Sequence, residues 1–393
     1  MKKNLLALFL ISCSLVTAQS AFEKTVFRDQ KINYGKPDST NVDPDVIRLL
    51  GGRLVLKKVT VLKFKKGTDV HLELKLRSNG DKWDKSGSCF VITDPEQISI
   101  LDVAKGEAEF PSASYVGTKH GGVLPAENYQ PVVELLRFMT PFGVGHYSND
   151  ERKYSKPVYV PKWEKEVVWN QDISELEDIT TGTFYIGVWI DSWTKTGYRI
   201  DLSLSYSGRP KKGRKVMPLF NAVKYVKGQA LPDFFAEGPL EYGLKVGADL
   251  KNVRLHYITT GHGGHSGGDE FIKIRNSVYF DNELVLDTIP WRDDCASFRR
   301  FNPTSGVWLR KDSAYYRNPA TRERAIKQIE ERLASSDLSR SNWCPGSKVV
   351  PIQVSLGDLK KGEHRLKVLI PATKAEKGKA NHWLVSAYLT YDD

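Results

Sequence analysis

The sequence has few cysteines and methionines, and it has no long apolar run beyond its first residues. Only 4 of its 393 residues are cysteine and only 3 are methionine. After the apolar run from Leu5 to Val16, no segment approaches the roughly 20 apolar residues that a bilayer-spanning helix needs. We therefore expect no transmembrane segment, and a fold that depends on strands and packing rather than on many disulfides.

The sequence also gives little support for a metal site or a phosphate-binding site. His262 and His265, in the glycine-rich stretch GHGGHSGGDEF, supply only two nitrogen ligands, and no further histidine or cysteine has the spacing that completes a site. The sequence contains no phosphate-cradling glycine loop. We predict no metal and no organic cofactor.

The first residues are typical of a secretory signal. Lys2 and Lys3 precede the apolar run, and small residues follow it at Val16, Thr17 and Ala18. We predict a signal peptide over residues 1–18 and an exported protein, periplasmic or secreted. An alternative is a surface lipoprotein, because Leu10-Ile11-Ser12-Cys13 resembles a lipoprotein box in which Cys13 would carry the lipid.

The basic charge does not indicate a nucleic-acid partner. Removing residues 1–18 takes away two lysines and no acid, so the net charge falls from +11 to +9. The cations are scattered along strand-like segments, as at Lys57, Lys58 and Lys63, which is typical of solvent faces and protected sheet edges. The compact run Arg209 to Lys215 is interpreted as a linker.

Three cysteines remain after export, which implies one pair and one free thiol. Cys89 lies in an apolar strand pattern and is interpreted as a small buried residue. Cys295 and Cys344 lie in loop-like segments that also contain tryptophan. We predict that these two form the disulfide.

In the rest of the chain, short strand patterns alternate with turn signals, and this predicts an all-β fold of two antiparallel sandwiches. The predicted units are a first domain over 19–208, a linker over 209–215 and a second domain over 216–393. A Gly- and Pro-rich insertion is expected over about 95–130. A helix is expected over about 320–336, because Ile326, Ile329 and Leu333 form one apolar stripe.

Three acidic residues are candidates for catalysis. Asp84 lies beside Trp83 in NGDKWDKSG, at the end of a predicted strand, although such residues are also ordinary turn chemistry. Asp191 lies in TFYIGVWIDSW, where alternation puts Tyr185, Trp189, Asp191 and Trp193 on one face, suited to stacking on sugar rings. Glu270 follows the glycine-rich stretch.

Four segments resemble, in the same order, segments of the bacterial peptide-N-glycosidase F family: DKWDKSG, RFMTPFGVG, IDSWTKTGYRIDLSLSYSGRP and RSNWCPG. The resemblance implies two adjacent eight-stranded jelly-roll sandwiches with the site between them. It implies that Asp84 is the catalytic acid or base, that Glu270 is a second essential acid, and that Asp191 replaces a glutamate.

The resemblance also implies binding residues. Trp193 matches a tryptophan beside the glycan core, and Arg340 and Trp343 match residues that organise the site. Trp83 is a further candidate for substrate binding, while Lys85 stands where the family has arginine and so lacks the bidentate fork.

The implied activity is an amidase that hydrolyses the bond between asparagine and the first N-acetylglucosamine of N-glycosylated proteins or glycopeptides, acting as a monomer. Two alternatives remain. The first is a carbohydrate-binding or adhesin protein that has the aromatic face without turnover. The second is a copper monooxygenase of similar architecture, for which only Met139 and Met217 are available besides the initiator.

Overall fold

The computed structural model describes residues 21–35, 43–62, 67–94, 96–111, 120–147, 160–211, 213–263, 268–374 and 381–392. The predicted signal peptide, Cys13 and His265 lie outside these ranges. No helix within the described ranges is long and apolar enough to cross a membrane.

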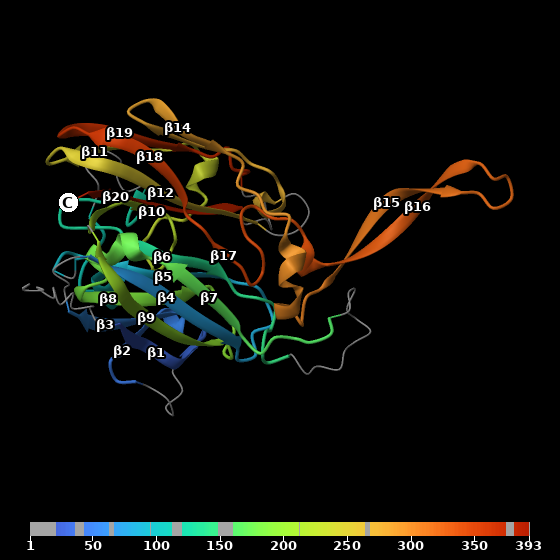
Figure 1. The fold of residues 1–393 in the computed structure, drawn as a ribbon, viewed down its shortest axis with the longest axis horizontal. Coiled ribbons are helices and arrows are strands. Elements are labelled where there is room, and N and C mark those ends of the chain that lie inside the picture. The colour runs from blue at the N-terminus through green and yellow to red at the C-terminus, as the bar shows by residue number, and fades with distance from the viewer. Residues whose placement is uncertain are drawn as a thin grey trace, which may run out of the picture.

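The first half of the chain forms two antiparallel sheets that pack face to face (Figure 1). One sheet has the order β1 (Phe22–Ile32), β9 (Tyr198–Lys211), β4 (Gly67–Ser78) and β7 (Val167–Asp172). The other has the order β17 (Lys348–Val349), β6 (Val133–Met139), β5 (Ser86–Ile92), β8 (Gly182–Ile190), β3 (Leu54–Val61) and β2 (Val46–Leu49). Alternation explains the packing, since Leu72, Leu74 and Leu76 of β4 are all at most 1% exposed and lie in the core between the sheets.

The second half forms another pair of sheets. One has the order β10 (Arg214–Asn221), β20 (His382–Asp392), β12 (Leu250–His262) and β18 (Ile352–Leu359), and the other β11 (Leu240–Val246), β19 (Gly362–Leu369), β13 (Asn276–Phe280) and β14 (Glu283–Thr288). Their apolar faces meet in a second core that includes Phe220, Leu255 and Trp383. The predicted two-domain β architecture is therefore confirmed.

The two domains are connected more closely than the sequence predicted. Residues 209–215 are mostly strand, because β9 reaches Lys211 and β10 begins at Arg214, so the predicted linker is wrong. Strand β17, assigned by the sequence to the second domain, pairs with β6 of the first. Because β9 and β10 continue through this segment, its backbone N–H and C=O groups form hydrogen bonds within the sheets, whereas those of a free linker would bond to water.

The predicted helix over about 320–336 is wrong. Residues Arg324–Ala334 form β16, which pairs along its whole length with β15 (Val307–Arg317). This two-stranded hairpin projects far from the body of the molecule, as the orange arm in Figure 1 shows. A helix in this position would have no neighbouring surface against which to bury its apolar side chains, so the apolar periodicity does not produce a helix.

The insertion over about 95–130 contains a short helix that the sequence analysis did not predict. Helix α1 spans Ile100–Lys105 and begins with a capping box between Ser99 and Asp102. Farther on, Val123 and Leu124 are buried in the core of the second domain, and the Asn221 amide donates to the carbonyl of Val123 at 2.9 Å. The insertion thus fastens the two domains together.

Candidate active site

The loop that joins β4 to β5 carries two aspartates with different surroundings. Strand β4 ends at Ser78, and Gly80 turns the chain with a φ of 119° that favours glycine. The buried Asp81 accepts hydrogen bonds from the hydroxyls of Ser192 (2.8 Å) and Thr194 (3.1 Å) and from the Trp83 amide (3.1 Å). Asp81 therefore holds the loop in shape.

Asp84, in contrast, is directed toward the second domain. Its Oδ2 lies 3.7 Å from Nη2 of Arg340, and its side chain is 20% exposed. Loss of hydration raises the pKa of Asp84, and the charges of Arg340 and the neighbouring Lys85 oppose this shift. The sequence did not decide whether this loop is an ordinary turn or part of a site. In the structure the carboxylate of Asp81 stabilises the loop, and that of Asp84 is available for chemistry.

Glu270 reaches the same arginine from the other domain. It lies in a short 3-10 turn, Asp269–Phe271, after β12, and its Oε1 is 3.0 Å from Nε of Arg340. The turn is fixed by Asp269, which is fully buried and accepts a hydrogen bond from Nε1 of Trp383 at 2.8 Å. The backbone of Ser341 also donates to the carbonyl of Glu270 at 2.9 Å.

Arg340 bridges the two acids and is itself held tightly. Its Nη1 and Nη2 donate to the carbonyl oxygen of Ser335 at 3.2 and 2.9 Å. The guanidinium lies over the rings of Trp343 (4.7 Å) and Phe271 (5.1 Å), and its side chain is only 3% exposed. The structure therefore brings together Asp84, Glu270, Arg340 and Trp343, four residues that the family resemblance had singled out.

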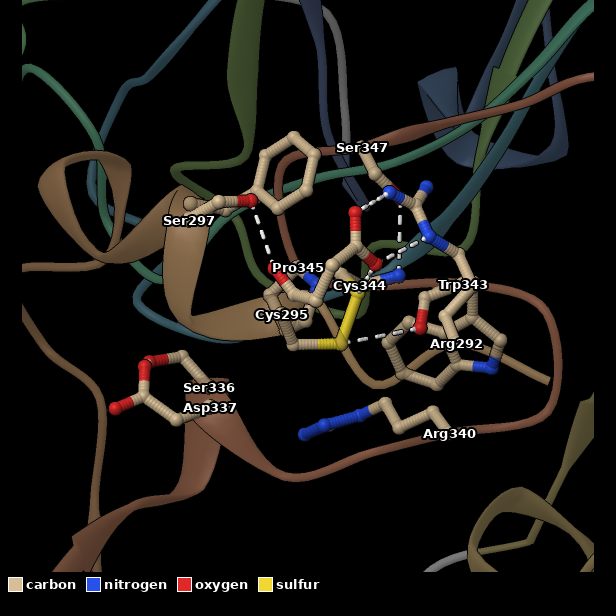
Figure 2. Close-up of a disulfide and its surroundings, with 12 residues drawn as sticks. Arg292, Cys295, Ser297, Ser336, Asp337, Arg340, Trp343, Cys344, Pro345 and Ser347 are labelled. Carbon is tan, nitrogen blue, oxygen red and sulfur yellow. Dashed lines mark hydrogen bonds and ion pairs between the residues drawn. A yellow bond between two sulfur atoms is a disulfide. The ribbon is translucent and has the colours of Figure 1, made fainter.

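The disulfide supports the segment that carries Arg340 and Trp343. Cys295 and Cys344 are bonded, with Cα atoms 5.1 Å apart, so this prediction is confirmed. Figure 2 shows Arg340, Trp343 and Cys344 on one loop beside the bond. Arg292 and Arg340 exchange two backbone hydrogen bonds, of 2.9 and 3.0 Å, which add a second tie. Among the cysteines that the structure describes, Cys89 is free and buried.

Burial shifts the pKa of both acids in the same direction. The pKa of Glu270 is raised to about 8, mainly because burial removes hydration; the charge of Arg340 opposes this shift and the charge of the nearby Asp84 adds to it. Burial also raises the pKa of Asp84, against the opposing charges of Arg340 and Lys85. Two carboxyls that share one cation favour a state with a single proton between them.

Asp191 and Trp193 form a second group near the first. Both lie just beyond the end of β8, and the Asp191 amide donates to the Ser86 carbonyl at 3.0 Å. Arg53 connects the two side chains, since its Nη1 is 3.2 Å from Asp191 Oδ1 and its guanidinium lies 4.1 Å from the centre of a Trp193 ring. Asp191 is 42% exposed and Trp193 58%, so both are accessible to a ligand.

A cavity of about 740 Å³ lies between the domains at this group. Its first-domain wall includes Arg53, Ser86, Asp191 and Trp193, and its second-domain wall includes Lys224, Tyr225, Leu231, Asn381 and His382. Ser86 is two residues from Asp84 along the chain. Asn381 accepts a hydrogen bond from the backbone of Asp269, the neighbour of Glu270, at 3.2 Å. The cavity is therefore lined by neighbours of the segments that carry Asp84 and Glu270, and neither carboxyl itself is among its lining residues.

Some predicted site features are placed differently. Tyr185 and Trp189 do not form an open sugar-binding face, because Tyr185 packs against an apolar cluster and Trp189 is only 6% exposed and meets the ring of Tyr225 edge-on at 5.8 Å. Trp189 nevertheless lines the cavity together with Asp191 and Trp193. The aliphatic alternation shows which residues are apolar, but it cannot show that both faces of β8 are covered. Trp83 is 54% exposed and is not among the residues that line the cavity.

Other residues of the site were missed. Arg53 and Asn381 lie far from the recognised motifs, and Asn381 has a buried side-chain nitrogen with no hydrogen-bond partner among the described residues. His262, considered as a metal ligand, is buried between the rings of Trp343 and His382 and bonds to the hydroxyl of Thr260. Burial lowers the pKa of His262 well below its usual value. Within the described ranges, no three His, Cys, Asp or Glu side chains are grouped to hold a metal ion.

Comparison with known proteins gives consistent results for both domains. Residues 24–206 match the model of the peptide-N-glycosidase F N-terminal domain, and residues 230–390 match that of the C-terminal domain. No curated protein matches the chain.

Solved structures are similar over nearly the whole chain. PNGF-II, in crystals of space groups P21 and C2, is 34% and 33% identical, with a TM-score of 0.80 in each case, over 94% and 95% of this chain. The chain spans 65% of the length of PNGF-II. PNGase F, described as a glycosylasparaginase from Flavobacterium meningosepticum, shares the fold at 12% identity, with a TM-score of 0.57 over 95% of this chain and 96% of its own.

The two domain matches and the similarity to PNGF-II cover the fold and the segments that carry the carboxyl pair. This chain belongs to the peptide-N-glycosidase F family.

Proposed function

We propose that this protein is an exported amidase that hydrolyses the bond between an asparagine side chain and the first N-acetylglucosamine of an N-linked glycan. The observation that supports the proposal best is the half-buried pair of Asp84 and Glu270 on either side of Arg340, with an interdomain cavity near the segments that carry them. Binding of a sugar alone would not require two carboxyls whose pKa values are raised by burial.

In the proposed reaction, Asp84 acts as the base. Water adds to the carbonyl carbon of the asparagine side chain as Asp84 takes one of its protons. The carbon–nitrogen bond then breaks, the nitrogen takes a proton and leaves with the glycan as a glycosylamine, and aspartate remains in the polypeptide. Both the added oxygen and the transferred protons come from the water and the carboxyl pair, so no other reactant is needed.

Glu270 suits the role of proton donor. Because its pKa is about 8, it holds a proton at neutral pH and can donate to the substrate carbonyl oxygen or to the leaving nitrogen. Arg340 has its donors directed to Glu270 and Ser335. It therefore positions the carboxyls more readily than it binds the oxyanion directly.

Asp191, Trp193 and Arg53 would contact the glycan. The exposed indole offers an apolar face to a sugar ring, and the carboxylate offers an acceptor to its hydroxyls. Lys85, Trp343 and the exposed Trp83 complete the set of proposed binding residues, with Trp343 acting through Arg340.

The test is incubation of the purified protein with an N-glycopeptide in water labelled with heavy oxygen. Mass spectrometry should show release of the glycan and one heavy oxygen in the new aspartate. An unchanged glycopeptide across high-mannose, complex and core-fucosylated substrates would contradict the activity. Retained glycan binding without cleavage would instead favour a carbohydrate-binding protein of the same fold.

A further inference from the structure

The hairpin of β15 and β16 is attached directly to the candidate active site. Just before β15, the hydroxyl of Thr304 donates to the carbonyl of Lys82 at 2.6 Å, in the loop that carries Asp84. Just after β16, the carbonyl of Ser335 accepts both hydrogen bonds from the guanidinium nitrogens of Arg340. The arm therefore begins at the carboxyl pair and extends away from the body (Figure 1).

The arm is not part of the interdomain cavity, since none of the residues that line the cavity belongs to β15 or β16. If the cavity holds the glycan, as proposed above, the polypeptide that carries the glycosylated asparagine must leave the carboxyl pair in a direction away from the cavity. The root of the hairpin contacts Lys82, in the loop that carries Asp84, and Arg340, and it is therefore near the carboxyl pair without lining the cavity.

The two faces of the hairpin differ in charge. The register pairs Lys311 with Glu330, Leu309 with Arg332, Tyr315 with Ile326 and Arg317 with Arg324, so these residues share one face, which we call the basic face. Its charged members are four cations and one acid. The opposite face carries Arg310, Lys327, Asp312 and Glu331 and is therefore neutral, with Arg310 and Glu331 paired to each other.

The basic face also exposes apolar side chains. Leu309 is 59% exposed, Tyr315 65% and Ile326 58%. The guanidinium of Arg324 lies 4.2 Å from the centre of the Tyr315 ring, a cation–π contact that helps to hold the ring in place. Among the described strands, the hairpin pairs with no third strand, so both of its long edges present free backbone groups.

We propose that the basic face of this hairpin binds the polypeptide part of an acidic glycoprotein substrate in an extended conformation, a proposal that rests on the proposed function. Free strand edges can pair with an extended chain, exposed apolar side chains can pack on its residues, and the cations complement its carboxylates. A second copy of this chain is a poor occupant, because the face carries a surplus of cations and the whole chain is basic.

Binding can be tested without catalysis. The probe is a fluorescent, unglycosylated peptide in which glutamate alternates with valine, and its affinity is measured by anisotropy at low and high salt. The double variant Tyr315→Ser with Ile326→Ser, and separately Lys311→Ser with Arg332→Ser, should each weaken binding by about tenfold. The control on the opposite face, Tyr316→Ser with Ala325→Ser, should leave it unchanged.

Catalysis gives the second readout. On an unfolded acidic glycoprotein the basic-face variants should raise KM by about tenfold with kcat unchanged, and on a short neutral glycopeptide they should equal the unaltered enzyme. Circular dichroism confirms that each variant is folded. Equal affinity of all variants for the peptide, an equal loss on both substrates, or binding to anionic lipid vesicles instead of the peptide would overturn the proposal. Peptide binding with no cleavage of any glycopeptide would contradict the proposed function alone.

Discussion

Asp81 and Asp84 lie three residues apart in one loop, yet their carboxylates have opposite surroundings. Asp81 is fully buried and accepts hydrogen bonds from Ser192, Thr194 and the Trp83 amide. Asp84 is partly exposed and faces Arg340 of the second domain. One carboxylate builds the loop, and the other is delivered by it to the site.

This difference predicts opposite effects of two matched substitutions. Asp84→Asn should lower kcat by about a hundredfold to ten-thousandfold, because it removes the proposed base. Its Tm should stay close to that of the unaltered protein. Asp81→Asn should lower stability by about 1–3 kcal/mol, because it disturbs a buried hydrogen-bonded acceptor. Kinetics on one glycopeptide and thermal unfolding distinguish the two, and a fully active Asp84→Asn enzyme would show that the base is elsewhere.

The activity should have an alkaline limb that Glu270 controls. The proposed reaction needs Asp84 ionised and Glu270 protonated, so kcat/KM should fall at low pH as Asp84 gains a proton and fall again as pH rises through about 8. Glu270→Gln keeps a donor but cannot ionise. Its remaining activity, although lower, should lack the alkaline limb in a pH–rate profile; a limb that persists in the variant would assign it to another group.

The same residue predicts how stability varies with pH. The pKa of Glu270 is about 8 in the folded protein against an ordinary value of 4.5. The folded state therefore binds more protons than the unfolded state between these values, so its contribution to stability is present at low pH and is lost as pH rises through about 8. Glu270→Gln should raise the Tm relative to the unaltered protein at pH 8 and above. If the two Tm curves stay parallel between pH 4.5 and about 8, Glu270 does not titrate as described.

Asp191 and Trp193 should act on binding more than on chemistry. Trp193→Ala removes the exposed indole and should raise KM by about tenfold with little change in kcat. Asp191→Asn loses the ion pair but keeps a hydrogen-bond acceptor for Arg53, so it should have a smaller effect than Asp191→Ala, which leaves Arg53 with neither. Initial rates at saturating and limiting glycopeptide separate the two parameters. A large fall in kcat in any of these variants would move that residue into the reaction itself.

The disulfide should stabilise both the fold and the site. Cys295→Ser with Cys344→Ser should cost about 2–5 kcal/mol of unfolding free energy. It should also lower kcat, because Arg340 and Trp343 share the loop of Cys344. Reductant should lower the Tm of the unaltered protein and leave that of the double variant unchanged. Cys89→Ala, which alters the free buried thiol, is the control for reductant sensitivity.

Part of this structure followed from local pattern. The alternation of Leu72, Leu74 and Leu76 predicted a strand with one buried face, and all three lie in the core. The loop-like settings of Cys295 and Cys344 predicted the bond between them. Asp84 and Arg340 were found through ordered motifs that resemble those of a known family, and Glu270 through a weaker match to that family, since nothing in their spacing brings residues so far apart together.

Tertiary structure decided the rest, because the deciding contacts join distant segments. The apolar spacing of Ile326, Ile329 and Leu333 predicted a helix, but Arg324–Ala334 obtains its hydrogen bonds from Val307–Arg317 and becomes a strand. Arg53 and Asn381 carry no sequence signal and enter the site only because two sandwiches enclose a cavity there. The sequence by itself determined which residues are apolar, charged or able to form a disulfide. The packing of the two domains determined which carboxylates lose water, and that loss is the physical reason that the pKa of Glu270 is raised.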